Sequence, residues 1–230
     1  MQPNVLGLPA HPKPETSSAS FESNAAVLAG AALLATTLSA QTTTPPPVMD
    51  VEILNYLLKL ERLEASFYTE GLKRFTPTDF SNAAFSANLG NPAGLFGDSV
   101  TSDSFVYLFL VRDQNQTHVQ TLIRSVNSMS GTPSPACTYT FTYTTVDDFL
   151  TIAKTLADAV VSGYVGAMRS ISSPPILTAA ATAMTTEARH AAYLHLIAGD
   201  NPFPNAFEPA KSMTDTLTAV NGYITACPTA

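Results

Sequence analysis

Charged residues are scarce in this chain of 230 residues: 13% are Asp, Glu, Lys or Arg, about half the share that is usual in soluble domains. Basic residues are the scarcest, with 11 Lys and Arg against 18 Asp and Glu, which gives a formal net charge of −7. Proteins that bind nucleic acids or anionic membranes depend on clusters of Lys and Arg, and the sequence contains no such cluster. We therefore expect no nucleic-acid partner.

Several catalytic and cofactor-binding motifs are also absent. The sequence has no glycine-rich phosphate loop, no Gly-x-Ser-x-Gly nucleophile motif and no cysteines at the spacing of a zinc finger. These absences argue against nucleotide-dependent enzymes, serine hydrolases and structural zinc domains. Hydrophobic residues make up 45% of the chain, which is enough to build the core of a folded domain.

Only two cysteines are present, Cys137 and Cys227. A bond between them would close a loop of about 90 residues, which the chain-entropy model values at roughly 4–5 kcal/mol before strain is subtracted. The alternative is two unrelated buried thiols. We favour the disulfide, and with it a protein that is secreted or lies in another oxidising compartment.

The longest apolar run near the amino terminus is the Ala/Leu-rich segment Ala25–Leu38. It is too short to span a bilayer, so we expect no transmembrane anchor. Its length fits the apolar region of a secretory signal with a cut after Ser39 or Ala40, and the alternative is a short Ala-rich helix. We therefore divide the chain into a signal-like or flexible segment, 1–47, and a helical domain, 48–230.

Four long segments show the apolar periodicity of amphipathic helices, and a shorter one follows them. The predicted helices are Val48–Phe75, Thr101–Met129, Val146–Ile171, Pro174–Ala198 and Pro209–Ile224. Thr76–Val100 is expected to be a connection, either a contact surface or a lid, and Gly131–Thr145 a loop with a short extended piece. This pattern predicts an all-α fold, an up-and-down four-helix bundle with an additional C-terminal helix.

Polar residues interrupt the apolar faces of three predicted helices. Glu64 lies on the first helix, His118 on the second, and Glu187 and His190 on the fourth. An ionised carboxylate in a core is costly unless it is paired or bound to a metal. The Glu-x-x-His spacing places both side chains on one helical face, as di-metal bundle sites require.

Five segments, LERLEASFY, NQTHVQTL, ACTYTF, TEARHAAYL and ITACP, resemble the ferritin-like family of secreted stress- and desiccation-related proteins of fungi and plants. The resemblance covers about Met49 to Pro228, and its most specific piece is Glu187-Ala-Arg-His190. It implies a four-helix bundle whose fully equipped members hold a di-iron site. In such members the first and third helices each supply a Glu, and the second and fourth each supply a Glu-x-x-His.

Four of the six ligand positions implied by the resemblance are filled here, by Glu64, His118, Glu187 and His190. The other two carry Asn115 on the second helix and Ala157 on the third. Both replacements remove a carboxylate, and a di-iron centre needs bridging carboxylates. The sequence therefore speaks against dinuclear oxygen or peroxide chemistry.

Three interpretations of this polar cluster remain. It is a metal-free network of paired charges, a depleted site for one divalent ion of iron, manganese or zinc, or a dinuclear site that survives with Asp158 turned inward or with water filling the gaps. We rank them in that order.

The leading hypothesis for function is a non-catalytic stress-associated or cell-surface protein with a degenerate di-iron site, no enzyme and no resident cofactor. The alternatives are a mononuclear metal-binding protein or a residual di-iron oxidase. A homo-oligomer or an assembly partner fits either, and no substrate is identified.

Overall fold

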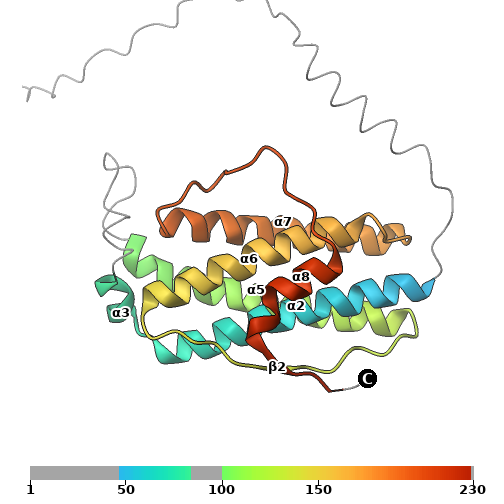
Figure 1. The fold of residues 1–230 in the computed structure, drawn as a ribbon, viewed down its shortest axis with the longest axis horizontal. Helices are drawn as coiled ribbons and strands as arrows, with labels where there is room; N and C mark the ends of the chain where they lie inside the picture. The colour runs from blue at the N-terminus through green and yellow to red at the C-terminus, as the bar shows by residue number, and fades with distance from the viewer. Residues whose placement is uncertain (1–46, 84–99, 229–230) are drawn as a thin grey trace, which may run out of the picture. The chain divides into compact units, whose positions relative to one another are not determined.

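The computed structural model describes residues 47–83 and 100–228, which belong to the larger of the two units into which the chain divides, Met1–Thr43 and Thr44–Ala230. Its helices are α2 (Pro47–Arg74), α3 (Pro77–Asn82), α5 (Val100–Ser128), α6 (Val146–Met168), α7 (Pro174–Ile197) and α8 (Met213–Val220) (Figure 1). The all-α bundle is confirmed, and each end of the four long helices lies within three residues of its predicted position. The signal-like segment lies outside the described residues. None of the described helices is long and apolar enough to cross a membrane.

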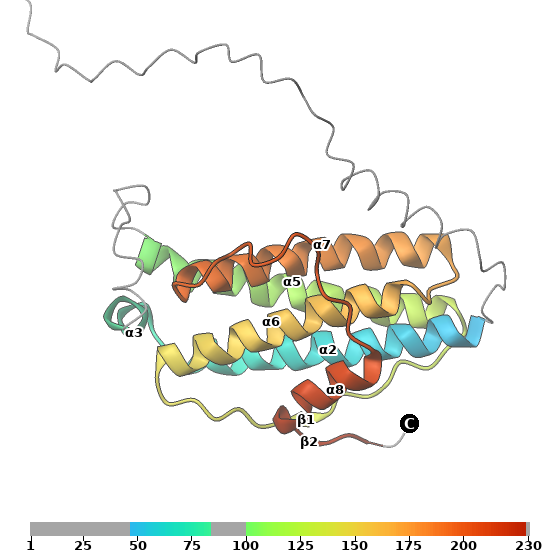
Figure 2. The ribbon, with the colours of Figure 1, turned by 45° about the horizontal axis from the view of Figure 1, so that its top comes forward.

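The four long helices form two antiparallel pairs, α2 with α5 and α6 with α7 (Figures 1 and 2). One connection, 129–145, runs back along the whole of α2 before α6 begins. Asn55 near the start of α2 accepts a hydrogen bond from the Ser134 backbone N–H at 2.7 Å, and Glu70 near its end accepts one from the Tyr143 hydroxyl at 3.3 Å. Because of this crossover, α5 and α6 run in the same direction, a topology that ferritin-like bundles share and that differs at this connection from the predicted up-and-down order.

The short helix α3 lies where the sequence analysis expects only a connection. Thr76 caps it through the Asp79 backbone N–H, the Asp79 carboxylate accepts in return from the Thr76 N–H, and Pro77 occupies the first helical position. This capping box is readable in the sequence Thr-Pro-Thr-Asp, but the helix is too short for apolar periodicity to reveal it. The rest of the connection, 84–99, lies outside the described residues.

The bundle core changes character along its length. Aliphatic side chains fill the end where α2 begins, with Ile53 and Leu57 fully buried. Rings fill the other end, where Phe67 stacks on Phe149 with centroids 4.6 Å apart. Gly71 lies so close to this cluster that a Cβ atom there would come within 2.2 Å of the Phe149 ring. The glycine therefore allows α2 and α6 to approach each other.

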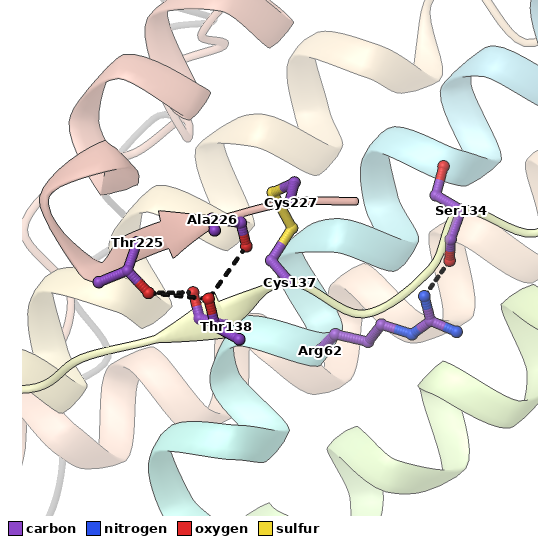
Figure 3. The surroundings of a disulfide bond; sticks show 7 residues. All are labelled: Arg62, Ser134, Cys137, Thr138, Thr225, Ala226 and Cys227. Carbon is purple, nitrogen blue, oxygen red and sulfur yellow. Dashed lines mark hydrogen bonds between the residues drawn. A yellow bond between two sulfur atoms is a disulfide. The ribbon is translucent and has the colours of Figure 1, made fainter. Parts of the chain in front are cut away.

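The C-terminal segment returns to the crossover and is bonded to it (Figure 3). Cys137 and Cys227 form the expected disulfide. Beside it β1 (Thr138–Tyr139) pairs antiparallel with β2 (Ile224–Ala226). The predicted fifth helix, 209–224, is wrong in length: α8 ends at Val220, and a 3₁₀ turn at Asn221–Tyr223 leads into β2. The Ile-Thr pair favours a strand, and Thr138 and Thr225 join their hydroxyls at 2.9 Å.

Asp50 joins the first and last helices of the bundle. It is 1% exposed and accepts hydrogen bonds from the backbone N–H groups of Ser172 and Ser173 at 2.8 and 2.9 Å. The Ser172 hydroxyl donates to it as well, at 3.0 Å. The carboxylate thus satisfies N–H groups at the start of α7 that have no partner within that helix. It anchors α7 to α2 near the aliphatic end of the bundle.

Candidate metal centre

Helix α2 contributes two glutamates to the middle of the bundle, Glu61 and Glu64, which are 0% and 1% exposed. Glu64 is one of the predicted ligands, whereas Glu61 is not among them. Leu57, Glu61, Glu64 and Tyr68 follow one another at spacings of four, three and four residues, so they lie on one helical face. That spacing predicts that Glu61 faces the core as Glu64 does, but the family pattern has a single glutamate ligand on this helix.

Helices α5 and α7 bring the other side chains to the same level. Asn115 of α5 donates from Nδ2 to Glu64 Oε2 at 3.0 Å. His118, one turn further on, places its Nδ1 3.3 Å from Glu61 Oε1 and 2.8 Å from Glu187 Oε1. The imidazole of His118 therefore lies between one carboxylate from α2 and one from α7.

Three of these residues, Glu61, His118 and Glu187, are arranged as a set of metal ligands. Each offers one ligand atom, and the three atoms lie within 4.8 Å of one another. Both carboxylates are fully buried. An imidazole nitrogen with two carboxylate oxygens is a donor set that zinc, manganese and iron accept.

Two further side chains hold the carboxylates of this set in place. His190 Nδ1 lies 3.0 Å from Glu187 Oε2, and its Nε2 lies 2.7 Å from Gln114 Oε1. The Tyr164 hydroxyl on α6 donates to Glu61 Oε1 at 2.6 Å. His190, a predicted ligand, thus lies beside the triad, in contact with Glu187.

Several buried polar atoms at the centre lack a hydrogen bond in the described part of the chain. They are Glu187 Oε1, Asn115 Oδ1 and the Tyr68 hydroxyl. Glu187 Oε1 is near enough to His118 to attract its charge, but the angle between them does not make a hydrogen bond. Unsatisfied buried oxygens are costly, and a cation or an ordered water would relieve that cost. The residues present therefore fit a metal ion.

The two glutamates of α2 resist ionisation. Burial, with the nearby charge of Glu187, raises the pKa of Glu61 to about 7. Burial raises the pKa of Glu64 well above its usual value, and the charges of Glu187 and Glu61 add to this effect. Both carboxyl groups therefore favour the neutral form more than an exposed glutamate does.

Glu187 and His118 behave in the opposite way. Burial alone would raise the pKa of Glu187, but the neighbouring imidazoles of His118 and His190 outweigh it and lower the pKa. Burial likewise disfavours the charged form of His118, yet Glu187 and Glu61 raise its pKa to about 10. The metal-free centre is therefore built on a carboxylate–imidazolium pair, from which a metal ion must displace a proton.

The α6 side of the centre supplies no carboxylate. Ala157, at the ligand position of the third helix, is buried and apolar. Its neighbour Asp158 is 47% exposed and lies 2.9 Å from His195 Nε2 on α7. Asp158 is therefore not turned inward, and the form of the dinuclear interpretation that relied on Asp158 is without support in this geometry.

The sequence matches a known domain family. The profile of the ferritin-like domain matches residues 49–200. Protein rds1 of Schizosaccharomyces pombe (strain 972 / ATCC 24843) is 26% identical over 180 residues, which are 78% of this chain and 40% of that protein. The match thus covers less than half the length of this relative. The family match covers more than half of the chain, and the bundle and its buried Glu and His residues agree with it: the chain belongs to the ferritin-like domain family.

Proposed function

We propose that this chain is a ferritin-like metal-binding protein that holds one divalent transition-metal ion through Glu61, His118 and Glu187. One observation carries the proposal: three ligand atoms from three helices lie within 4.8 Å of one another, inside the core. The unsatisfied Glu187 Oε1 supports it, because a cation bound by the triad gives this oxygen a partner.

The remaining residues of the predicted set have supporting roles in this proposal. Glu64, whose Oε2 accepts a hydrogen bond from Asn115 Nδ2 at 3.0 Å, could supply a further carboxylate oxygen as a ligand. His190 orients Glu187, and such outer contacts normally tune a metal site. One ion is proposed rather than two because Asn115 and Ala157 stand where the family pattern places bridging carboxylates. A bound ion would supply a Lewis acid, and with iron or manganese a redox centre.

A metal-free structural role is the competing candidate, and a specific observation favours it. The charges of the centre already have protein partners: His118 lies between two carboxylates, and Tyr164 donates to Glu61. Such a network can hold a bundle in register without adding much net stability. The chain would then be the non-catalytic, stress-associated or cell-surface protein that its resemblance to secreted ferritin-like proteins implies.

Metal content separates the two candidates. The full chain, purified without chelator, is analysed by mass spectrometry for bound metal, together with Glu187→Gln and the control Glu52→Gln. Glu52 lies on α2 like the glutamates of the centre, but its side chain is exposed. We expect about one ion per chain in the wild type and the control, and none in Glu187→Gln.

Two other results would count against the proposal. Absence of metal after loading with iron, manganese and zinc would leave the structural network as the function of the centre. Two ions per chain would show a dinuclear site, and oxidase assays would follow.

We further propose that the protein is secreted or works in another oxidising compartment, with 1–47 as a signal-like segment ahead of the helical domain 48–230. The disulfide between Cys137 and Cys227 supports this, because such bonds persist in oxidising compartments. Detection of the protein in culture medium, with an amino terminus near residue 40, is the expected result. A protein retained in the cytosol with both thiols reduced would contradict it.

A further inference from the structure

A pocket opens between α5 and α7 and ends at the candidate metal centre. Its volume is about 280 Å³, and its inner wall includes His118 and Tyr164. It extends along α7 from Ile176 to Thr186, a length of about 15 Å at the rise of an α-helix. Small side chains on α7, including Ala179 and Ala183, leave the room for it. The pocket is therefore a slot that runs along the helices.

The two ends of this slot differ in polarity. Leu54, Ile176 and alanines of α7 line one end together with Ser125, Leu122 lies between the ends, and His118, Thr121 and Thr186 line the other end. Four hydroxyl groups in the lining donate their protons to backbone carbonyls of their own helices: Thr121, Ser125, Thr182 and Thr186. Tyr164 donates to Glu61. The lining hydroxyls thus have no proton left for a ligand.

His118 also forms part of the polar end of the slot. Its Nδ1 faces Glu61 and Glu187, and among the described residues none bonds to its Nε2. The ring is 14% exposed and forms part of the pocket wall. A ligand that reaches the polar end therefore meets an imidazole nitrogen to which no described residue is bonded.

Two arginines flank the same polar end. Arg124 of α5 donates to the Thr121 hydroxyl at 3.0 Å, and Arg189 of α7 donates to the Thr186 hydroxyl at 3.0 Å. Both threonines line the pocket, and both arginines are exposed. Within the described residues neither arginine forms an ion pair with an acid, although the chain carries an excess of acids over bases. Two guanidinium groups without an acidic partner thus lie on opposite sides of the slot.

We infer that this slot binds a small amphipathic monocarboxylate, with its carboxylate at the arginine-flanked polar end and its apolar chain along α7. The size follows from the volume, which is roughly twice that of an engineered cavity that takes up benzene, so a ligand of roughly a dozen carbon and oxygen atoms fits. The inference rests on the proposed function only in that it places this ligand next to a bound metal.

Calorimetric titration of the full chain with decanoate tests the inference, with decylamine as a ligand of similar length and opposite charge. Ala183→Leu fills the slot, and the control Thr185→Leu adds the same side chain at an exposed position outside it. We expect saturable decanoate binding that is unchanged in the control and at least about tenfold weaker in Ala183→Leu. Decylamine should not bind measurably.

A double variant, Arg124→Gln with Arg189→Gln, tests the head group without disturbing the core, since both side chains are exposed. Decanoate should bind about tenfold more weakly to it. Equal decanoate affinity in Ala183→Leu and Thr185→Leu, or decylamine binding as tight as decanoate binding, would overturn the inference.

The same titration with Glu187→Gln distinguishes this inference from the proposed metal function. Decanoate binding that keeps its dependence on Ala183 in a chain without metal would support the pocket while the metal proposal fails. Metal binding without any decanoate affinity would leave the metal proposal standing and overturn the inference.

Discussion

Two histidines of this protein lie between two carboxylates each, and the clusters differ in the surroundings of the acids. His118 and His195 are similarly exposed, at 14% and 16%. The acids around His118, Glu61 and Glu187, are fully buried, whereas Asp158 beside His195 is 47% exposed. Water screens a charge at an exposed acid, but a buried one depends on the protein or on an ion. Burial of the acids therefore marks the His118 cluster as the candidate site.

The largest expected effect comes from removing an acid of each cluster. In the metal-free chain, Glu187→Ala should lower the free energy of unfolding by about 3–5 kcal/mol, because it leaves the His118 charge buried with one partner fewer. Asp158→Ala should cost about 1 kcal/mol or less, since its pair with His195 is open to solvent. Urea denaturation measures both values. Equal losses would show that burial does not distinguish the clusters.

The disulfide tests whether metal binding merely reports overall stability. Replacing both Cys137 and Cys227 by Ser should lower the free energy of unfolding by about 2–4 kcal/mol, because the unfolded chain gains freedom. The bond joins the crossover to the C-terminal strand, so helix content at 25 °C and metal per chain should stay unchanged. Circular dichroism and mass spectrometry check these outcomes. Loss of the metal from the chain without the disulfide would show that metal binding depends on overall stability.

Addition of zinc tests which of the two histidine clusters binds the metal. A free zinc concentration 100 times the dissociation constant should stabilise the wild type by about 2.7 kcal/mol. We expect zinc to raise the melting temperature of the wild type and of His195→Gln, and to leave that of Glu61→Gln unchanged. Loss of the shift in His195→Gln instead would place the site at the exposed cluster.

The smallest effect concerns pH at the exposed cluster. A hydrogen bond and the charge of Lys154 lower the pKa of Asp200 below its usual value of 3.8. The stabilisation from this pair is therefore complete above pH 3.8 and is lost as the pH falls through the lowered pKa. NMR titration of the Asp200 carboxyl should show the low pKa in the wild type and a higher one in Lys154→Gln. An unchanged pKa would assign the shift to another neighbour.

Much of the fold could be predicted from the sequence because the long helices repeat their apolar residues over many turns. Local rules are weaker for short elements: α3 has six residues, and α8 stops where Ile224 and Thr225 enter the sheet. Gly222 lies just before this change. Apolar periodicity could not predict β2, because this strand pairs with β1, which lies far away in the sequence.

The position of the candidate site in the bundle could be predicted from the sequence, but the full set of its residues could not. His118 and Glu187 lie where their helical faces predict, in the middle of the bundle. Glu61 was overlooked because one face of α2 carries two glutamates, and their packing decides which one meets His118. The direction of Asp158 toward His195 depends on how α6 packs against α7, which no local pattern records.

The Cys137–Cys227 bond also makes the chain a closed ring of covalent bonds from the crossover to the C terminus. Helices α6, α7 and α8 belong to this ring, together with Glu187. The segment between α7 and α8 carries Phe207, which is 82% exposed. A single cut by chymotrypsin after Phe207 therefore opens the ring without releasing a fragment. The cut protein would run as one species on a non-reducing gel and lose a short C-terminal peptide only after reduction.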